Sequence, residues 1–457
     1  MRITLKDLSA LQSVEIVNGG GLKNKNITGI SIDSRTIEPG NIFVALRGEK
    51  FDGHQFVDEV FKKGAAAVMV DEAWRRTNNP LATSPANTLA IVPDTTKAFG
   101  ELAKMYRRRF SIPVLAVGGS NGKTTTKEMI SAVLRTTYSV LSTEGNLNNH
   151  IGVPKMLFRL TPKHDIAVLE LGTNHFGELK YLCEIAEPTH AILTNVAREH
   201  LEYFGDETGV AREETELFRS LPPKGFAFVN VDDNHLLKAG AKIRRSAKYG
   251  VSRKAGVRAL NVHLDERGCS EFDLGVKGKK SRLHLSTPGL HNVSNALAAA
   301  AVGLTFKVPK KKIISALESF KGANRRMEII KRNSITILND TYNANPDSVL
   351  AALQTLKSMK VEGKKIVVLA DMLELGSRAE HEHARLGLAV SDLEFEYLLT
   401  FGPLSRFTHE ASKLAFAEYF DSKDALIASL KSLIAPGDAV LVKGSRGMKM
   451  EEVVDKI

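Results

Sequence analysis

The decapeptide VGGSNGKTTT, Val117 to Thr126, directly follows the apolar run IPVLA. A glycine-rich turn between a strand and a helix can hold phosphate, because its backbone N–H groups turn inward and the helix N-terminus adds partial positive charge. The common phosphate-loop pattern G-x-x-x-x-G-K-[ST] would place a glycine at Val117, so only a shorter G-x-x-G-K-T remains. Three threonines open the expected helix, although threonine is a poor helix former. The stretch therefore favours a phosphate loop over a purely structural turn.

Two side chains of this loop have expected roles of their own. Lys123 would reach the β- and γ-phosphates of a nucleotide, and the Thr124 hydroxyl would bind Mg²⁺. The nucleotide-binding residues expected from the loop are Gly119, Ser120, Asn121, Gly122, Lys123, Thr124 and Thr125.

Similar apolar runs recur along the chain and end in polar residues or glycine. Helical patterns such as residues 126–138 and 347–359 lie between several of them. Continuous apolar strands alternating with helices predict an α/β fold with parallel sheets covered on both faces. In such sheets, ligands bind beyond the carboxyl ends of the strands. The runs are DIAVLELG (165–172), HAILTNVA (190–197), GFAFVNVDD (225–233), KIVVLAD (365–371) and DAVLVKG (438–444).

Composition limits the class of protein. The 457 residues are 43% hydrophobic and 25% charged, as in globular proteins, and no apolar stretch is long enough to span a bilayer. The N-terminus lacks the apolar core of a signal peptide, so we expect a cytoplasmic protein, and a monomer. The two cysteines exclude a disulfide framework or a cysteine metal site. The net charge of +11 suits small polyanionic substrates or a solvated basic surface. Nucleic acid is not an expected partner, because basic residues are scattered without interleaved aromatics.

Several segments together resemble one enzyme family. The loop GSNGKTT is similar to that of the Mur ligases, the ATP-dependent amide-forming enzymes of peptidoglycan precursor synthesis. Further segments resemble motifs of this family in the family's order, which makes coincidence very improbable. They are residues 33–56 (uridine-nucleotide module), 145–154, 169–179 and 193–205 (central domain), 288–299 (adenine segment), and NDTYNANPDS (339–348) and DMLELG (371–376).

The resemblance implies three domains and a reaction. The expected domains are a uridine-nucleotide domain (1–85), a central ATP-binding domain with a phosphate-loop-type parallel sheet (86–320) and a Rossmann-like C-terminal domain (321–457). The last two motifs are similar to those of the member that joins D-alanyl-D-alanine to UDP-N-acetylmuramoyl-tripeptide through an acyl phosphate. Two alternatives stay open: a sibling that adds a single amino acid, and a ligase-like nucleotide-binding scaffold without turnover.

Site residues in the central and first domains follow from the resemblance. It implies that Glu170 binds Mg²⁺ together with Thr124, and that His200 lies at a second Mg²⁺, although imidazole is not a preferred Mg²⁺ ligand. Lys123, Glu170 and His200 form the expected catalytic set. The substrate contacts implied outside the C-terminal segment are Asn149, Asn195, Ser34 and Arg35.

The C-terminal half supplies the remaining candidates. Asn292 and Asn295 would hold the adenine or its loop, Arg326 would lie near the nucleotide, and Asp340 could bind ribose hydroxyls. Asn343 and Asn345 would handle the incoming D-alanyl-D-alanine. A cation in the segment VKGSRGMKME could hold a peptide carboxylate, and its candidate residues are Lys443, Ser445 and Arg446.

Three positions depart from the family pattern, one of them Ala370, which precedes Asp371 where a glycine is usual. Arg325 stands where a glycine is common. The family lysine that becomes carbamylated and binds the second Mg²⁺ is also missing, because no lysine occurs between Lys180 and Lys224. Glu214 aligns at that position and offers the same charge on a shorter side chain. It is either a replacement metal ligand or a helix-surface residue.

Overall fold

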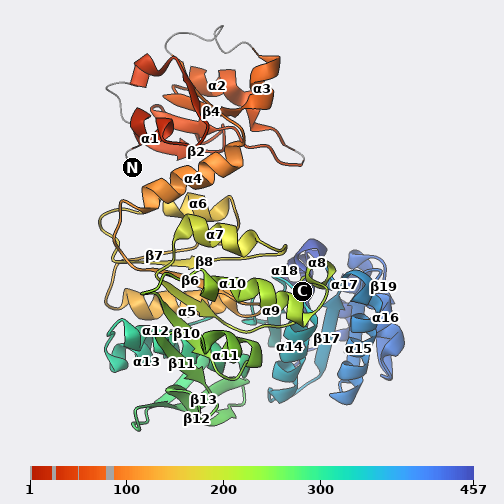
Figure 1. The fold of residues 1–457 in the computed structure, drawn as a ribbon. Coiled ribbons are helices and arrows are strands. Elements are labelled where there is room, and N and C mark those ends of the chain that lie inside the picture. The colour runs from red at the N-terminus through yellow and green to blue at the C-terminus, as the bar shows by residue number, and fades with distance from the viewer. Residues whose placement is uncertain (1–2, 23–26, 50, 79–86) are drawn as a thin grey trace. The chain divides into compact units, whose positions relative to one another are not determined.

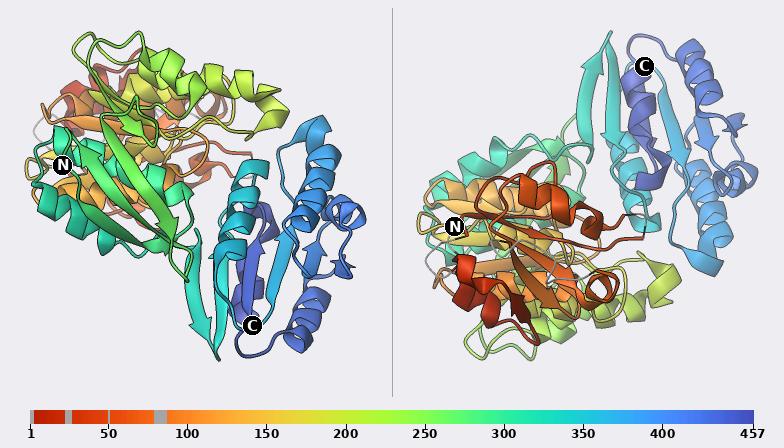
Figure 2. Two further views of the ribbon diagram at one scale, coloured as in Figure 1. Left: turned by 90° about the horizontal axis from the view of Figure 1, so that it is seen from below. Right: turned by 90° about the horizontal axis from the view of Figure 1, so that it is seen from above.

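The computed structural model describes residues 3–22, 27–49, 51–78 and 87–457. The chain forms three sheets and divides into two compact units (Figures 1 and 2). The first unit holds Met1–Val114, Leu141–Leu171 and Lys180–Pro188, and the second holds Leu115–Val140, Gly172–Leu179 and Thr189–Ile457. The predicted α/β class is confirmed. No helix within the described ranges is both long and apolar enough to cross a membrane.

The first sheet is built from the N-terminal segment and has the order β1-β5-β4-β3-β2. Strands β2 to β5 run parallel, whereas β1 runs antiparallel to β5. Its core packs Phe43, Val68 and Leu89 of the strands against Val57 and Val60 of α2. The elements are α1 (Leu5–Ser9), β1 (Glu15–Val17), η1 (Gly19–Leu22), β2 (Gly29–Ser31), β3 (Asn41–Val44), η2 (Gly53–Phe56), α2 (Val57–Lys62), β4 (Ala67–Asp71), α3 (Glu72–Thr77), β5 (Thr88–Val92) and α4 (Thr95–Arg107).

The expected limit of the first domain, residue 85, falls outside the described residues. Strand β5 follows this position and still belongs to the first sheet.

The second sheet has nine strands in the order β14-β13-β12-β11-β10-β9-β6-β8-β7. All five residues of β6 are buried, as a continuous apolar strand requires, and α5 starts directly after Gly122. Helices α5 and α12 pack against each other beside this sheet (Figure 1). The elements are β6 (Val114–Gly118), α5 (Lys123–Arg135), β7 (Val140–Ser142), α6 (Gly152–Leu157), β8 (Ile166–Glu170), α7 (Glu178–Ala186), β9 (His190–Leu193), α8 (Leu201–Phe204), α9 (Glu207–Glu214), α10 (Glu216–Arg219), β10 (Phe226–Asn230), α11 (Asn234–Gly240), β11 (Ser246–Gly250), β12 (Val257–Leu264), β13 (Cys269–Val276), β14 (Arg282–Pro288), α12 (His291–Thr305) and α13 (Lys310–Glu318).

The third sheet has the order β15-β16-β20-β17-β18-β19, and only β15 is antiparallel to its neighbour. Helices α17 and α18 cover one face, where Leu426 and Val453 pack on Val440 and Val442, and α14 and α15 lie on the other (Figure 2). The elements are β15 (Glu328–Arg332), β16 (Ile335–Asp340), α14 (Pro346–Ser358), β17 (Lys365–Ala370), η4 (Gly376–Arg378), α15 (Ala379–Asp392), β18 (Tyr397–Phe401), α16 (Ser405–Ala411), β19 (Phe416–Phe420), α17 (Lys423–Leu433), β20 (Ala439–Lys443), η5 (Arg446–Met448) and α18 (Glu451–Lys456).

Strand register brings polar strand ends together at the carboxyl edges of both large sheets. In the second sheet Gly118 is the register partner of Leu193, so the loops after β6 and β9 begin side by side. In the third sheet Asp340 is the register partner of Lys443. The expected ligand-binding edges are therefore built from neighbouring parallel strands.

Candidate active site

The phosphate loop is shaped by glycines that no other residue could replace without strain. Gly119 has φ +104°, and a Cβ there would lie 2.4 Å from the Thr194 hydroxyl oxygen. Gly122 has φ +81°, and its Cβ would lie 2.7 Å from the Asn295 amide oxygen. Val117 is instead a buried residue of β6. The loop is therefore shorter than the common pattern because the strand continues through the position of the usual first glycine.

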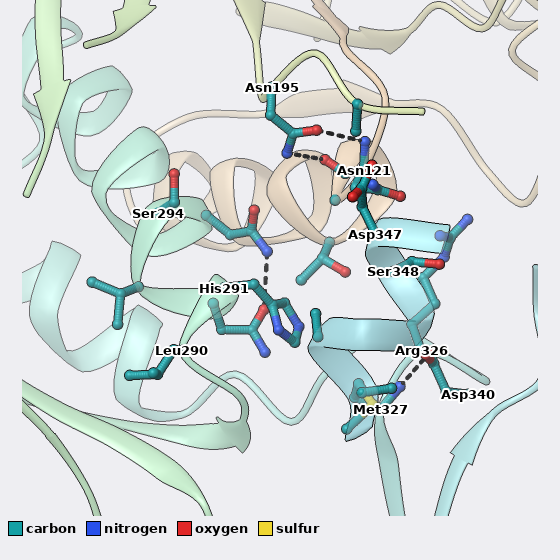
Figure 3. A pocket seen from close by; sticks show the side chains of 18 of the residues that line it. Asn121, Asn195, Leu290, His291, Ser294, Arg326, Met327, Asp340, Asp347 and Ser348 are labelled. Carbon is teal, nitrogen blue, oxygen red and sulfur yellow. Dashed lines mark hydrogen bonds between the residues drawn. The ribbon is translucent and has the colours of Figure 1, made fainter. Parts of the chain in front are cut away.

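Asparagines hold this loop from two sides, and Figure 3 shows the side formed by Asn195. Asn195 accepts a hydrogen bond from the Asn121 backbone N–H at 2.9 Å and donates to the Asn121 carbonyl at 3.0 Å. The Asn121 side chain in turn accepts from the Asn345 amide at 2.8 Å. Asn345 also caps the N-terminus of α14. The structure thus brings together three predicted site residues from three separate segments.

A carboxylate that the sequence did not single out faces the loop lysine. Lys123 Nζ donates to the Ser120 carbonyl at 3.0 Å and lies 3.4 Å from Glu199 Oε1. Thr124 and Thr125 follow Lys123 in the first turn of α5, and Thr125 lines the adjoining cavity. The cation and both hydroxyls therefore lie at the start of one helix, where phosphate binds best.

A cavity of about 540 Å³ opens beside the loop. Asparagine side chains line it together with charged ones, and two exposed apolar residues, Val251 and Leu290, also line it. Its lining includes the predicted nucleotide residues Asn121, Gly122, Thr125, Asn292, Asn295, Arg326 and Asp340, together with Asn195, Asn343 and Lys443.

The two asparagines of α12 bond to the protein itself. Asn295 accepts from the Thr126 hydroxyl at 3.0 Å and donates to Asn292 at 2.9 Å. Asn292 donates to the Pro288 carbonyl at 2.8 Å. These contacts hold the start of α12 against α5, and an adenine-binding role of the two asparagines stays a prediction.

Two charged groups of this cavity, Asp340 and Lys443, neutralise each other. Lys443 is buried and donates to Asp340 at 2.5 Å and to the Asn343 carbonyl at 2.8 Å. The other oxygen of Asp340 accepts from the Met327 backbone at 3.1 Å. The Arg326 guanidinium lies 3.9 Å from the centre of the Tyr342 ring. Lys443 is thus held by Asp340, which leaves Arg446 as the exposed cation among the candidates Lys443, Ser445 and Arg446.

Arg325, which replaces a common glycine, has φ +58°. The left-handed backbone conformation explains why glycine suits this position, and ion pairing of Arg325 with Glu451 at 2.9 Å accompanies it here.

A second cavity, of about 160 Å³, has charged walls. It shares Asn343 with the larger cavity, so the two adjoin. Ser445 is buried and accepts from the Leu373 backbone at 2.8 Å, whereas Arg446 is half exposed and donates to Glu451 at 2.8 Å. The lining comprises Glu199, His200, Asn343, Ala344, Asn345, Leu373, Glu374, Leu375, Ser445, Arg446 and Gly447.

His200 lies between two carboxylates in this small cavity. Its Nδ1 pairs with Glu374, and its Nε2 lies 3.9 Å from Glu199. Burial alone would lower the pKa of His200, but the hydrogen bond to Glu374 and the charge of Glu199 outweigh burial and raise it. The hydrogen bond from His200 lowers the pKa of Glu374 against its own burial. The pair therefore holds the His200 ring with Nδ1 against a carboxylate.

Glu214 is buried, so its interpretation as a helix-surface residue is wrong. Its Oε2 accepts a hydrogen bond from the Gly119 N–H at 2.7 Å, directly behind the phosphate loop. Burial raises the pKa of Glu214 to about 7, and nearby Lys123 partly offsets this rise. Whether Glu214 is a metal ligand stays a prediction.

Two predicted site residues belong to the first unit. Glu170 ends β8 and is buried; its Oε1 accepts from Asn148 at 2.9 Å, and its Oε2 has no hydrogen-bond partner. Asn149 accepts from the Ile151 and Gly152 backbone at 3.1 and 2.9 Å, as a turn-forming asparagine does.

The predicted uridine contacts also lie in the first unit, in the loop between β2 and β3. Ser34 is buried, and its carbonyl accepts from Lys63 at 3.0 Å. The Arg35 side chain is 85% exposed and pairs with Asp33 at 2.7 Å.

Sequence reasoning missed four polar residues of these sites: Arg198, Glu199, Glu374 and Asn148. All four lie inside quoted motifs, so a charged or amide residue next to a known site residue was the available signal. Arg198 donates from its backbone to Asp347 at 2.9 Å and lies 3.2 Å from Glu382. Consecutive residues 198–200 therefore each face a different carboxylate or the loop lysine.

No group of three or more histidine, cysteine or acidic side chains suited to a metal occurs among the residues that the structure describes. Mg²⁺ at nucleotide sites is commonly held by one or two protein oxygens together with phosphates and water. The unpartnered, buried oxygen of Glu170 fits such a ligand.

Family models match three successive stretches of the chain. They are described as "Mur ligase family, catalytic domain" (residues 26–107), "Mur ligase middle domain" (117–303) and "Mur ligase, glutamate ligase domain" (325–446).

Named relatives match along nearly the whole chain. UDP-N-acetylmuramoyl-tripeptide–D-alanyl-D-alanine ligase of Bacillus subtilis is 38% identical over 94% of this chain and 92% of its own. The Escherichia coli enzyme of the same name is 39% identical over 97% and 96%. A crystal structure of MurF from Acinetobacter baumannii has a TM-score of 0.91 at 32% identity, covering 100% of this chain and 98% of its own. MurF from Thermotoga maritima in complex with ADP has a TM-score of 0.84 at 27% identity, covering 94% and 97%.

Proposed function

The chain belongs to the Mur ligase family, and we propose that its two adjoining cavities serve the ligation of D-alanyl-D-alanine to UDP-N-acetylmuramoyl-tripeptide. The protein is an ATP-dependent ligase of peptidoglycan synthesis. The observation that carries the proposal is the junction of a large cavity beside the phosphate loop with a small, charged cavity at His200. Relatives named UDP-N-acetylmuramoyl-tripeptide–D-alanyl-D-alanine ligase match over more than nine-tenths of the chain.

The reaction has two steps. A carboxylate oxygen of the tripeptide attacks the γ-phosphorus of ATP, which forms an acyl phosphate and releases ADP. The amine nitrogen of D-alanyl-D-alanine then attacks the acyl carbon, releases phosphate and loses a proton. Lys123 stabilises the charge that develops on the transferred phosphoryl group. Both steps require that water is kept from the acyl phosphate.

The large cavity is the proposed nucleotide site. Asn292 and Asn295 fix the start of α12 against the phosphate loop, and Arg326 and Asp340 line the wall that would face the nucleotide. Because Asp340 is held by Lys443, its orientation toward a ribose would be fixed in advance.

We propose Thr124, Glu170, His200 and Glu214 as the residues that would hold Mg²⁺. The hard carboxylate oxygens of Glu170 and Glu214 suit this ion best. Bound Mg²⁺ would supply neutralisation of phosphate charge. Glu214 has a further role in this account, because it fixes the Gly119 backbone N–H whether or not it meets a metal.

The small cavity is the proposed site of the incoming dipeptide. Arg446 could bind its carboxylate, since an arginine offers two parallel donors to a carboxylate. Asn343 and Asn345 would then lie beside the amine end, and Ser445 would hold the loop of Leu373 in place.

Assignments in the first unit stay proposals. We propose that Ser34 and Arg35 contact the uridine nucleotide. We propose that Asn149 contacts the acyl group and that Asn195, beside the phosphate loop, has the corresponding role there. We propose that the three domains follow the three sheets, near the expected limits 1–85, 86–320 and 321–457. We also propose that the protein is cytoplasmic, since the reaction consumes ATP, and that it is a monomer.

Purified protein incubated with ATP, UDP-N-acetylmuramoyl-tripeptide and D-alanyl-D-alanine tests the function. We expect equal amounts of ADP and pentapeptide product. ADP formation with the dipeptide-level precursor and single amino acids instead would identify the sibling activity. Nucleotide binding without ADP formation under any combination would identify a scaffold and overturn the proposal.

A further inference from the structure

The loop Asp371 to Gly376 lines the small cavity and has a fixed shape, but the proposed reaction gives the side chain of Glu374 no role. Four hydrogen bonds hold its start. Ser405 N–H donates to the Asp371 carboxylate at 2.7 Å and Ser445 N–H to its carbonyl at 3.0 Å. Met372 N–H donates to His383 at 3.0 Å and Leu373 N–H to Ser445 at 2.8 Å. The next residue, Glu374, is therefore presented from a rigid base.

Glu374 and His200 contact each other, and each has a backbone conformation that is unfavourable unless surrounding contacts hold it. Glu374 has φ +62° and His200 has φ +50°, in the left-handed region that non-glycine residues seldom adopt. The Glu374 carboxylate pairs with His200 Nδ1, and the Glu374 carbonyl accepts from the Glu202 N–H at 3.1 Å. Such conformations persist where surrounding contacts impose them and often mark functional sites.

The pairing decides which ring atom faces the phosphate loop. With Nδ1 bound to Glu374, Nε2 points toward Glu199 at 3.9 Å, and Glu199 lies 3.4 Å from Lys123 Nζ. Side chains of alternating charge thus run from the loop after β17 to the phosphate loop. A carboxylate on one ring nitrogen commonly fixes the orientation and tautomer of a histidine that works through the other.

We propose that Glu374 is a positioning residue that orients His200 so that Nε2 faces the reacting phosphates. Glu374 comes from the third sheet and His200 from the loop after β9 of the second. The orientation of His200 therefore depends on contact between these two loops. This inference rests on the proposed function only for the effect on turnover, not for the effect on the ring.

Glu374→Gln and Glu374→Ala test the proposal, with Glu394→Ala as the matched control. Glu394 also has a left-handed backbone, φ +54°, but its side chain is 87% exposed and faces Lys357 at 3.6 Å, away from both cavities. The readouts are kcat, KM for ATP, the thermal midpoint and the ring ¹⁵N chemical shifts of His200, assigned with His200→Gln.

For Glu374→Ala we expect kcat to fall about 10- to 100-fold with KM for ATP within about threefold. The ¹⁵N shifts of His200 should move toward those of a ring without a fixed Nδ1 partner. Glu374→Gln should recover part of kcat, and the control should match the wild type in every readout. Unchanged His200 shifts in folded Glu374→Ala would overturn the proposal even if turnover fell. A wild type inactive in the ligation assay would overturn the proposed function. The ¹⁵N shifts of His200 would still test whether Glu374 orients its ring.

Discussion

The two adjoining cavities differ in size and in how closely the charged side chains of their walls are grouped. In the larger one, Asp340 and Lys443 neutralise each other at 2.5 Å, and the remaining charged side chains are spread over a wide wall that also holds asparagines and apolar residues. In the smaller one, Glu199, His200, Glu374 and Arg446 surround a much smaller space. A large cavity suits binding of a bulky ligand, whereas concentrated, preorganised charge suits stabilisation of a reacting group. The difference suggests a division between nucleotide binding and chemistry.

The largest effect is expected at Lys123, which faces Glu199 of the smaller cavity. Lys123→Ala removes the cation that meets charge developing on the γ-phosphate, so kcat should fall at least about a hundredfold. Steady-state ADP release measures this, and circular dichroism checks the fold. Lys311→Ala, on the exposed surface of α13, is the control and should keep full activity. Near wild-type turnover of Lys123→Ala would reduce the loop to a structural turn.

Glu214 should give an intermediate effect, because it acts behind the phosphate loop. Glu214→Ala leaves the Gly119 N–H without its buried acceptor, which should cost about 1–3 kcal/mol of stability. If Glu214 also binds metal, Glu214→Ala should need a higher Mg²⁺ concentration for half-maximal turnover than the wild type. The activity of the wild type should then not depend on bicarbonate. Chemical denaturation and Mg²⁺ titration measure both effects. Glu207→Ala, exposed at the start of the same helix, is the control.

The measurements on Glu214 distinguish a role in holding the loop from a role in binding metal. Lost stability with an unchanged Mg²⁺ requirement would confine Glu214 to holding the loop. Stimulation of the wild type by bicarbonate would contradict a glutamate in place of a carbamylated lysine.

A smaller and more selective effect is expected at Arg446. Arg446→Ala should raise KM for D-alanyl-D-alanine about tenfold, equivalent to about 1.4 kcal/mol, with KM for ATP unchanged. Initial rates at varied dipeptide and saturating ATP measure it. A rise in KM for ATP instead would assign Arg446 to the larger cavity and contradict the division between nucleotide binding and chemistry.

Much of the fold follows from local patterns in the sequence. The apolar runs at β6, β8, β9, β10, β17 and β20 are strands, and the helical patterns are α5 and α14. The antiparallel strands β12 to β14 were not predicted, because their inner and outer residues alternate and give no continuous apolar run. Strand β1 has three residues and pairs with a strand more than seventy residues away, which no local pattern indicates.

The site was predictable where a motif carries its own geometry. Glycines at Gly119 and Gly122 and the start of α5 define the phosphate loop from within ten residues. The partners of Lys123 and His200 were not predictable, since Glu199 and Glu374 meet them through folding of distant segments: His200 and Glu374 lie 174 positions apart. Spacing within the sequence contains no information on such a pair.

Comparing Arg326→Ala with Lys123→Ala side by side tests the division most directly. Arg326 lines the larger cavity against Tyr342, and Lys123 faces Glu199 at the smaller one. The measurement is kcat and KM for ATP of both variants and the wild type in one assay. Division of roles predicts that Arg326→Ala raises KM for ATP about tenfold with kcat within about threefold, while Lys123→Ala loses kcat by at least about a hundredfold. A loss of kcat in Arg326→Ala as large as that in Lys123→Ala would contradict it.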